Sequence, residues 1–111
     1  MRRFVRSLIQ NATVTSAERS AALTLDPVLM RAMEVRVFED VEIVNVATGA
    51  RFSAWVEEGA AGEVSVPQMR AGDIITIISH GFLHDGQTLA HKVRVVTAGP
   101  GNEVISIDEQ S

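Results

Sequence analysis

The chain has 111 residues, of which 46% are hydrophobic and 22% are charged, and its formal net charge is −4. These values predict one folded domain over residues 1–111 and argue against a nucleic-acid partner, because nucleic acids favour basic surfaces. The chain lacks cysteine, a membrane-length apolar run and a signal-peptide segment, so we expect a cytoplasmic protein without disulfides, thiolate chemistry or membrane contact.

The first third of the chain is rich in β-forming residues and contains one helix signal. Residues 4–15 predict a long or broken strand, and residues 23–25 predict a short one. Between them, Thr15 and Glu18 have the spacing of a helix capping box. Asp26-Pro27 is the clearest helix start, an N-cap carboxylate followed by proline. We expect a helix over residues 27–33 whose core face consists of Val28, Leu29, Ala32 and Met33.

A β-hairpin follows, after a possible strand over residues 35–38. Two apolar strands, residues 41–46 and 51–56, flank a four-residue connection that contains Gly49. Because side chains alternate along a strand, one face of the second strand should be buried and the other exposed. The first face carries Phe52, Ala54 and Val56, and the second carries Arg51, Ser53 and Trp55.

The second half of the chain predicts several more short strands. Residues 64–66 form a strand that ends at Pro67, and the β-branched residues 74–79 predict the most buried strand. Further strands are expected over residues 92–97 and, at a sheet edge, 103–107, while residues 80–90 should form an irregular loop. Many short strands with one short helix predict a small β-barrel.

Four segments of the chain resemble the pyruvoyl-dependent aspartate 1-decarboxylase family across nearly its whole length. They read NATVT (11–15), LTLDPVLMRA (23–32), VEIVNVATGARFS (41–53) and AGDIITIIS (71–79), and the hairpin is the most specific match. The resemblance implies a mainly β fold, a double-psi β-barrel with one short helix. It also implies a homo-oligomer, a tetramer with active sites between neighbouring subunits.

Members of that family cleave themselves at a Gly–Ser bond, and the serine becomes a pyruvoyl group that serves as an electron sink. The family's glycine and serine fall at Ala21 and Ala22 here, and alanine has no hydroxyl with which to attack a carbonyl. The nearest serine is Ser20, which would require a shifted register. We therefore expect no cofactor, with a pyruvoyl group only if cleavage occurs at Ser20.

Other positions also depart from the family. An N-terminal lysine and histidine are replaced, as are a threonine used in processing, a tyrosine that donates a proton and an asparagine after the short strand. The residues at these positions are Leu8, Gln10, Ala54, Trp55 and, approximately, Pro67. Arg51, which holds the substrate carboxylate in the family, is kept, and so is Asn45.

These comparisons select Arg51, Trp55 and Asn45 as substrate-binding candidates. Arg51 could hold a carboxylate through a bidentate pair, or it could be a surface arginine paired with Glu57 or Glu58. Trp55, the only tryptophan, could form a pocket wall or pack across a subunit interface.

His80 is the candidate catalytic acid or base, because it follows a predicted buried strand; the alternative is a solvated loop histidine. The spacing of His80, His84 and His91 matches no zinc pattern, so no metal is expected. Lys92 is the only lysine, and its position early in a strand predicts exposure and no Schiff base.

Three functions follow from these residues. The leading hypothesis is a pyruvoyl-free cyclase, isomerase or lyase that acts on a carboxylate-bearing small molecule in a specialised biosynthetic pathway. The second is aspartate 1-decarboxylation to β-alanine after self-cleavage at Ser20. The third is a non-catalytic relative that binds a metabolite or assembles with an active paralogue, and in which Trp55 could fill the pocket.

Overall fold

A computed structural model, which describes residues 1–86 and 90–111, places nine strands in one mixed sheet with a single α-helix. The strands are β1 (Arg2–Thr13), β2 (Ser16–Glu18), β3 (Ala22–Leu25), β4 (Asp40–Asn45), β5 (Arg51–Glu58), β6 (Val64–Pro67), β7 (Ile74–Leu83), β8 (Val93–Ala98) and β9 (Val104–Gln110). The helices are α1 (Pro27–Met33) and the short 3₁₀ segments η1 (Asp85–Ala90) and η2 (Pro100–Asn102).

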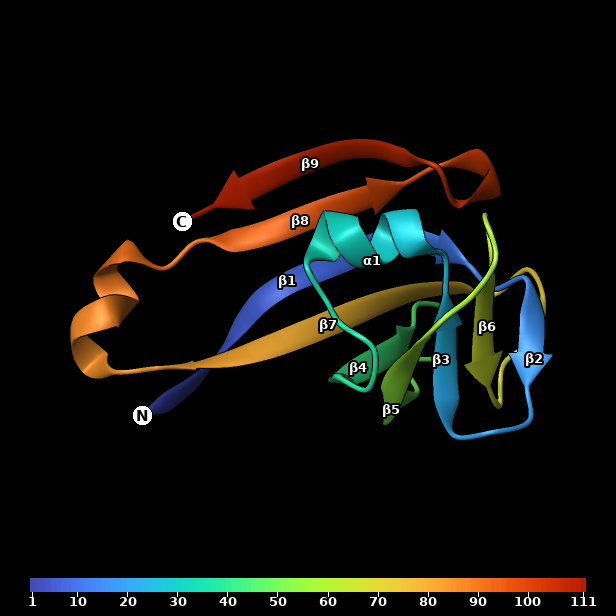
Figure 1. The fold of residues 1–111 in the computed structure, drawn as a ribbon, viewed down its shortest axis with the longest axis horizontal. Helices are drawn as coiled ribbons and strands as arrows, with labels where there is room; N and C mark the ends of the chain where they lie inside the picture. The colour runs from blue at the N-terminus through green and yellow to red at the C-terminus, as the bar shows by residue number, and fades with distance from the viewer.

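The strand order is β2-β6-β3-β5-β4-β7-β1-β8-β9. Strands that are distant in sequence pair in parallel, β1 with β8 and β3 with β5, whereas β4 pairs antiparallel with both β5 and β7. Figure 1 shows β1 and β7 as a long pair that leads from η1 into the cluster of shorter strands. The curved sheet therefore has an inner and an outer face along β5, β4 and β7.

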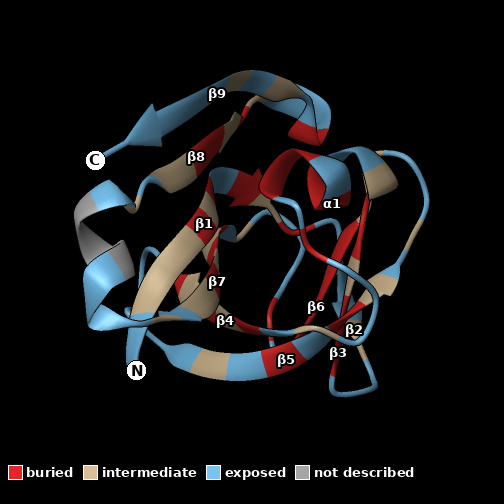
Figure 2. Ribbon diagram, turned by 60° about the vertical axis from the view of Figure 1, so that its left-hand side comes forward, coloured by how far each residue is buried: buried red, intermediate tan, exposed pale blue. Residues whose placement is uncertain are grey.

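The inner face and α1 enclose the hydrophobic core, which Figure 2 shows as the red segments gathered inside the fold. Along β7 the buried Ile75, Ile77 and Ser79 alternate with more exposed residues. The prediction that residues 74–79 form the most buried strand is therefore wrong, because only one face of β7 meets the core. All four residues of β6 are buried instead.

Helix α1 has the predicted bounds and the predicted start. Asp26 Oδ1 accepts a hydrogen bond from Val28 N at 2.7 Å, and Oδ2 accepts one from Gly62 N, also at 2.7 Å. The buried residues are Leu29, Met30, Ala32 and Met33. Val28 is 50% exposed, so its predicted place in the core was wrong: two turns of helix are too few to define a hydrophobic face by periodicity.

The predicted capping box at Thr15–Glu18 is a strand. Ser16, Ala17 and Glu18 form β2, which pairs in parallel with β6. Thr15 Oγ1 accepts a hydrogen bond from Val64 N at 2.9 Å rather than capping a helix. This long-range pairing outweighs a local helix signal that has no periodic apolar residues after it.

Two further predictions fail around α1 and β7. Residues 35–38 form a turn rather than a strand, and Phe38 has a φ of 69°. The predicted loop 80–90 begins as a continuation of β7, since Arg2, Arg3 and Phe4 of β1 pair with its end. The remaining predicted strands are present with small shifts at their ends, and β9 occupies the predicted edge. Of the described helices, none has the length and apolar character needed to cross a membrane.

Candidate functional site

The hairpin of β4 and β5 presents a polar outer face, as its sequence predicted. Arg51, Ser53 and Trp55 are exposed, whereas Ala54 and Val56 are buried between them. Across the hairpin, Trp55 lies opposite Asp40, Ser53 opposite Glu42, and Arg51 opposite Val44. The outer face therefore combines a guanidinium, a hydroxyl and an indole with the carboxylates of β4.

Arg51 forms an ion pair on this face, though with neither predicted carboxylate. Its Nη2 donates to Glu42 Oε1 at 2.5 Å, and this hydrogen bond lowers the pKa of Glu42 below its usual value. Glu57 instead accepts a hydrogen bond from Trp55 Nε1 at 3.2 Å. The prediction that Arg51 would pair with Glu57 or Glu58 missed Glu42, because the pairing depends on the cross-strand register and not on sequence distance.

Ser20 lies in the bend between β2 and β3 and lines a cavity of about 340 Å³. Its hydroxyl accepts a hydrogen bond from Ala22 N at 3.2 Å. Glu18 Oε1 accepts the backbone N–H groups of Arg19 at 2.9 Å and Ser20 at 3.4 Å. The carboxylate therefore holds the bend, and Ser53 of the hairpin forms part of the cavity wall.

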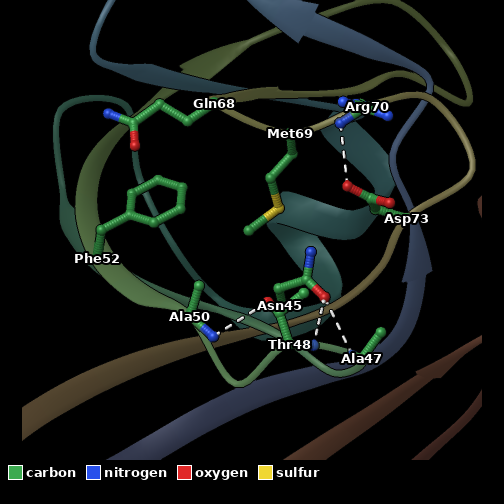
Figure 3. Close-up of a pocket in the computed structure, with 9 residues that line it drawn as sticks. All are labelled: Asn45, Ala47, Thr48, Ala50, Phe52, Gln68, Met69, Arg70 and Asp73. Carbon is green, nitrogen blue, oxygen red and sulfur yellow. Dashed lines mark hydrogen bonds between the residues drawn. The ribbon is translucent and has the colours of Figure 1, made fainter.

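A second cavity, of about 370 Å³, lies at the turn of the hairpin (Figure 3). Asn45 Oδ1 accepts the N–H groups of Ala47 at 3.0 Å and Thr48 at 3.2 Å, so it stabilises the turn. Figure 3 shows the amide nitrogen of Asn45 directed away from these two groups. Phe52 and Gln68 line this cavity and the Ser20 cavity alike.

A third cavity, of about 570 Å³, lies on the outer face beside His80, Glu42 and Ser53. Arg3 Nη2 donates to His80 Nδ1 at 3.0 Å. Because arginine has no acceptor, Nδ1 must be the unprotonated nitrogen in this contact, and Nε2 then carries the ring proton. Ser53 lines both this cavity and the Ser20 cavity, so the two share a wall.

The predicted site residues are thus only partly brought together. Arg51, Trp55 and His80 lie on the outer face, whereas Asn45 lies at the hairpin turn. Sequence reasoning missed Glu42 and Arg3 as partners of these residues. Glu42 does carry a signal, since it alternates with buried residues of β4 and so had to share a face with Arg51 or its neighbours.

His91 and Lys92 are the other candidate residues from the sequence. His91 Nε2 donates to Val5 O at 2.7 Å, and its ring packs on Phe4 with centroids 5.4 Å apart. Lys92 is exposed, as predicted. Among the described residues, no group of three histidine or acidic side chains is arranged to hold a metal ion.

Comparisons with known proteins agree on one family. The family model described as aspartate decarboxylase matches residues 1–105. An aspartate 1-decarboxylase of Methylibium petroleiphilum is 30% identical, with 96% of each chain covered. One from Ralstonia pickettii is 30% identical over 97% of this chain and 98% of its own, and one from Acinetobacter baumannii is 32% identical over 92% and 88%.

These relatives overturn the leading hypothesis of a pyruvoyl-free cyclase, isomerase or lyase built on the decarboxylase barrel. The hypothesis was wrong because it gave more weight to the replaced positions, Ala22 above all, than to the similarity of the whole chain. The named relatives favour the second hypothesis, aspartate 1-decarboxylation. The predicted fold class is confirmed, and this chain, a double-psi β-barrel with one short helix, belongs to the aspartate decarboxylase family of enzymes.

Proposed function

We propose that the protein is a lyase that removes a carboxylate from aspartate and forms β-alanine. The observation that carries the proposal is the position of Ser20, in a cavity that shares Ser53 with the outer-face cavity beside His80 and Glu42. In a chain that belongs to the aspartate decarboxylase family, a serine at this bend is the group from which the reactive carbonyl would form.

Ser20 is suited to form a pyruvoyl group, because it has the required hydroxyl and lies in a suitable position. It is exposed, it lines a cavity, and its own N–H and that of Arg19 are held by the Glu18 carboxylate. The chain would be cut between Arg19 and Ser20, and the new N-terminus of residue 20 would carry the pyruvoyl carbonyl. When present, that carbonyl takes up the electrons of the carbon–carboxylate bond that breaks.

The other residues of the site bind the substrate and move a proton. Arg51 holds the carboxylate that is not lost, through the guanidinium donors that Glu42 leaves free. His80 Nε2–H donates the proton that replaces the departing carbon dioxide. Trp55 would border the substrate from the outer face of β5, and the Asn45 amide nitrogen would contribute a hydrogen-bond donor in the cavity at the hairpin turn.

Several copies of the chain assemble in this proposal. From the family resemblance we expect a homotetramer with active sites between neighbouring subunits. Exposed hydrophobic side chains among the described residues support an assembly, and those on or beside the outer face are Val46, Trp55, Ile74 and Phe82. A partner subunit would cover this face and exclude water from the bound substrate.

The test combines the intact mass under denaturing conditions with β-alanine formation from aspartate. For the wild type we expect a fragment of residues 1–19, a fragment of residues 20–111 without a free α-amine, and β-alanine. Ser20→Ala should remain one species of 12.0 kDa and form no product. Ser106→Ala, which removes a hydroxyl from β9 at the opposite edge of the sheet, should behave as the wild type does.

A single uncut species without product in the wild type would overturn the proposal. Cleavage in Ser20→Ala would also overturn it, because the reactive carbonyl would then come from another residue.

A further inference from the structure

Glu42 is the only carboxylate that forms a described ion pair with Arg51. The two residues lie diagonally across the antiparallel strands β4 and β5, since Ser53 is directly opposite Glu42 and Val44 is directly opposite Arg51. The Glu42 side chain is 25% exposed and that of Arg51 is 57% exposed. The less exposed side chain therefore holds the more exposed one.

The contact uses only part of the guanidinium. Glu42 Oε1 accepts from Nη2, whereas arginine has five N–H donors in a planar fork. Nη2 has two N–H groups, one on the edge shared with Nε and one on the edge shared with Nη1. One contact at Nη2 therefore leaves one of these two edges available for a second carboxylate. An arginine can in this way be fixed by one carboxylate and still bind another in a bidentate pair.

Glu42 is itself held in the charged form that this arrangement requires. The hydrogen bond from Arg51 lowers its pKa, and the positive charges of Arg51 and Arg3 lower it further. These two cations lie on opposite sides of Glu42, Arg51 on β5 and Arg3 on β1. They also offset the repulsion between Glu42 and an incoming carboxylate.

We propose that Glu42 is a positioning residue which fixes the Arg51 guanidinium on the outer face, so that its remaining donors meet the carboxylate of a small dicarboxylate ligand. The inference rests on the proposed function for the role of Arg51. Without Glu42, a long exposed side chain would have to be ordered by the ligand, and the loss of its conformational freedom would weaken binding.

The test measures succinate binding at pH 7 through the fluorescence of Trp55, which lies on the same face. Succinate carries two carboxylates and no amine, so its binding requires neither chain cleavage nor turnover. We expect Glu42→Ala to weaken binding about tenfold through the lost order of Arg51. Glu42→Gln keeps an oxygen that accepts from Nη2, and it should bind within about threefold of the wild type.

Two more variants complete the design. Arg51→Ala should abolish binding. Glu109→Ala removes a glutamate from another arginine ion pair, with Arg94 on β8, and should leave binding unchanged.

The outcomes separate this inference from the proposed function. Binding by Glu42→Ala that equals or exceeds wild-type binding would overturn the positioning role and leave the proposed function standing. Equal losses in Glu42→Ala and Glu42→Gln would also overturn it, because charge rather than geometry would then be the contribution. Wild-type protein that fails to bind succinate would contradict the carboxylate site itself.

Discussion

The Glu63 carboxylate is bound by a backbone N–H group and a short polar side chain. Glu63 Oε1 accepts a hydrogen bond from Ala60 N at 2.9 Å, and Oε2 accepts one from Ser65 Oγ at 2.7 Å. The Ala60 bond first, and the Ser65 bond second, lower the pKa of Glu63 below its ordinary value of 4.5. Such a carboxyl stabilises the folded chain only while it is ionised.

The lowered pKa of Glu63 determines how the stability of the protein depends on pH. Because the folded-state pKa of Glu63 is depressed, its contribution is fully present above pH 4.5 and is lost as the pH falls through the folded-state value. We expect Glu63→Gln to lower the free energy of unfolding at pH 7 and to make it less dependent on pH between about pH 5 and pH 3. Urea unfolding at several pH values measures both effects.

Glu103→Gln is the control, since Glu103 is an exposed glutamate of the same charge. It should leave the dependence of stability on pH close to that of the wild type. A Glu63→Gln profile parallel to the wild-type profile would contradict the assignment.

Elements that depend on local signals were predictable from the sequence. The Asp26-Pro27 start locates α1 because the cap and the proline act within one turn, and alternation along residues 51–56 gives the outer face of β5. The bend at Ser20 and the strand β2 were not predictable, because their partner β6 lies more than forty residues away. The ion pair of Arg51 with Glu42 likewise depends on the hairpin register.

One buried side chain joins three elements. Asn102, at the end of η2, accepts a hydrogen bond from Thr13 N at 2.8 Å and donates to Thr13 O at 2.9 Å and Gly62 O at 3.0 Å. It thereby ties the end of β1 and the loop before β6 to the β8–β9 connection. Its φ is 60°, which asparagine tolerates better than most residues.

We expect Asn102→Ala to lower the free energy of unfolding by about 2–4 kcal/mol, because it removes three hydrogen bonds to partly buried backbone groups of Thr13 and Gly62. Asn11→Ala is a matched control: Asn11 is exposed and has a φ of 64°, so it tests the backbone conformation alone. In Asn11→Ala the free energy of unfolding should fall by only about 1–2 kcal/mol. Urea unfolding measures both values. Equal losses of unfolding free energy in the two variants would show that the hydrogen bonds of Asn102 contribute little to stability.

On the scale of the whole molecule, residues of the proposed site lie on a face that one chain leaves open. Arg51 and Trp55 are exposed, and apolar side chains lie on the same face of the neighbouring strands. A substrate bound here by one subunit would remain largely in water. The proposed tetramer would cover this face. The fold and family were easier to predict than the complete site, because the sequence of one chain does not say which surface covers the outer face.

The assembly can be tested by native mass. We expect the wild type to have the mass of four chains, and Ile74→Glu to shift it towards smaller species, because a charge on the outer face of β7 would be desolvated in the interface. Ile105→Glu adds the same charge at an isoleucine that is more exposed, 64% against 38%, on the edge strand β9. That variant should keep the wild-type mass. If Ile105→Glu were the variant that dissociates, the interface would lie at the β9 edge, and another surface would have to cover Arg51.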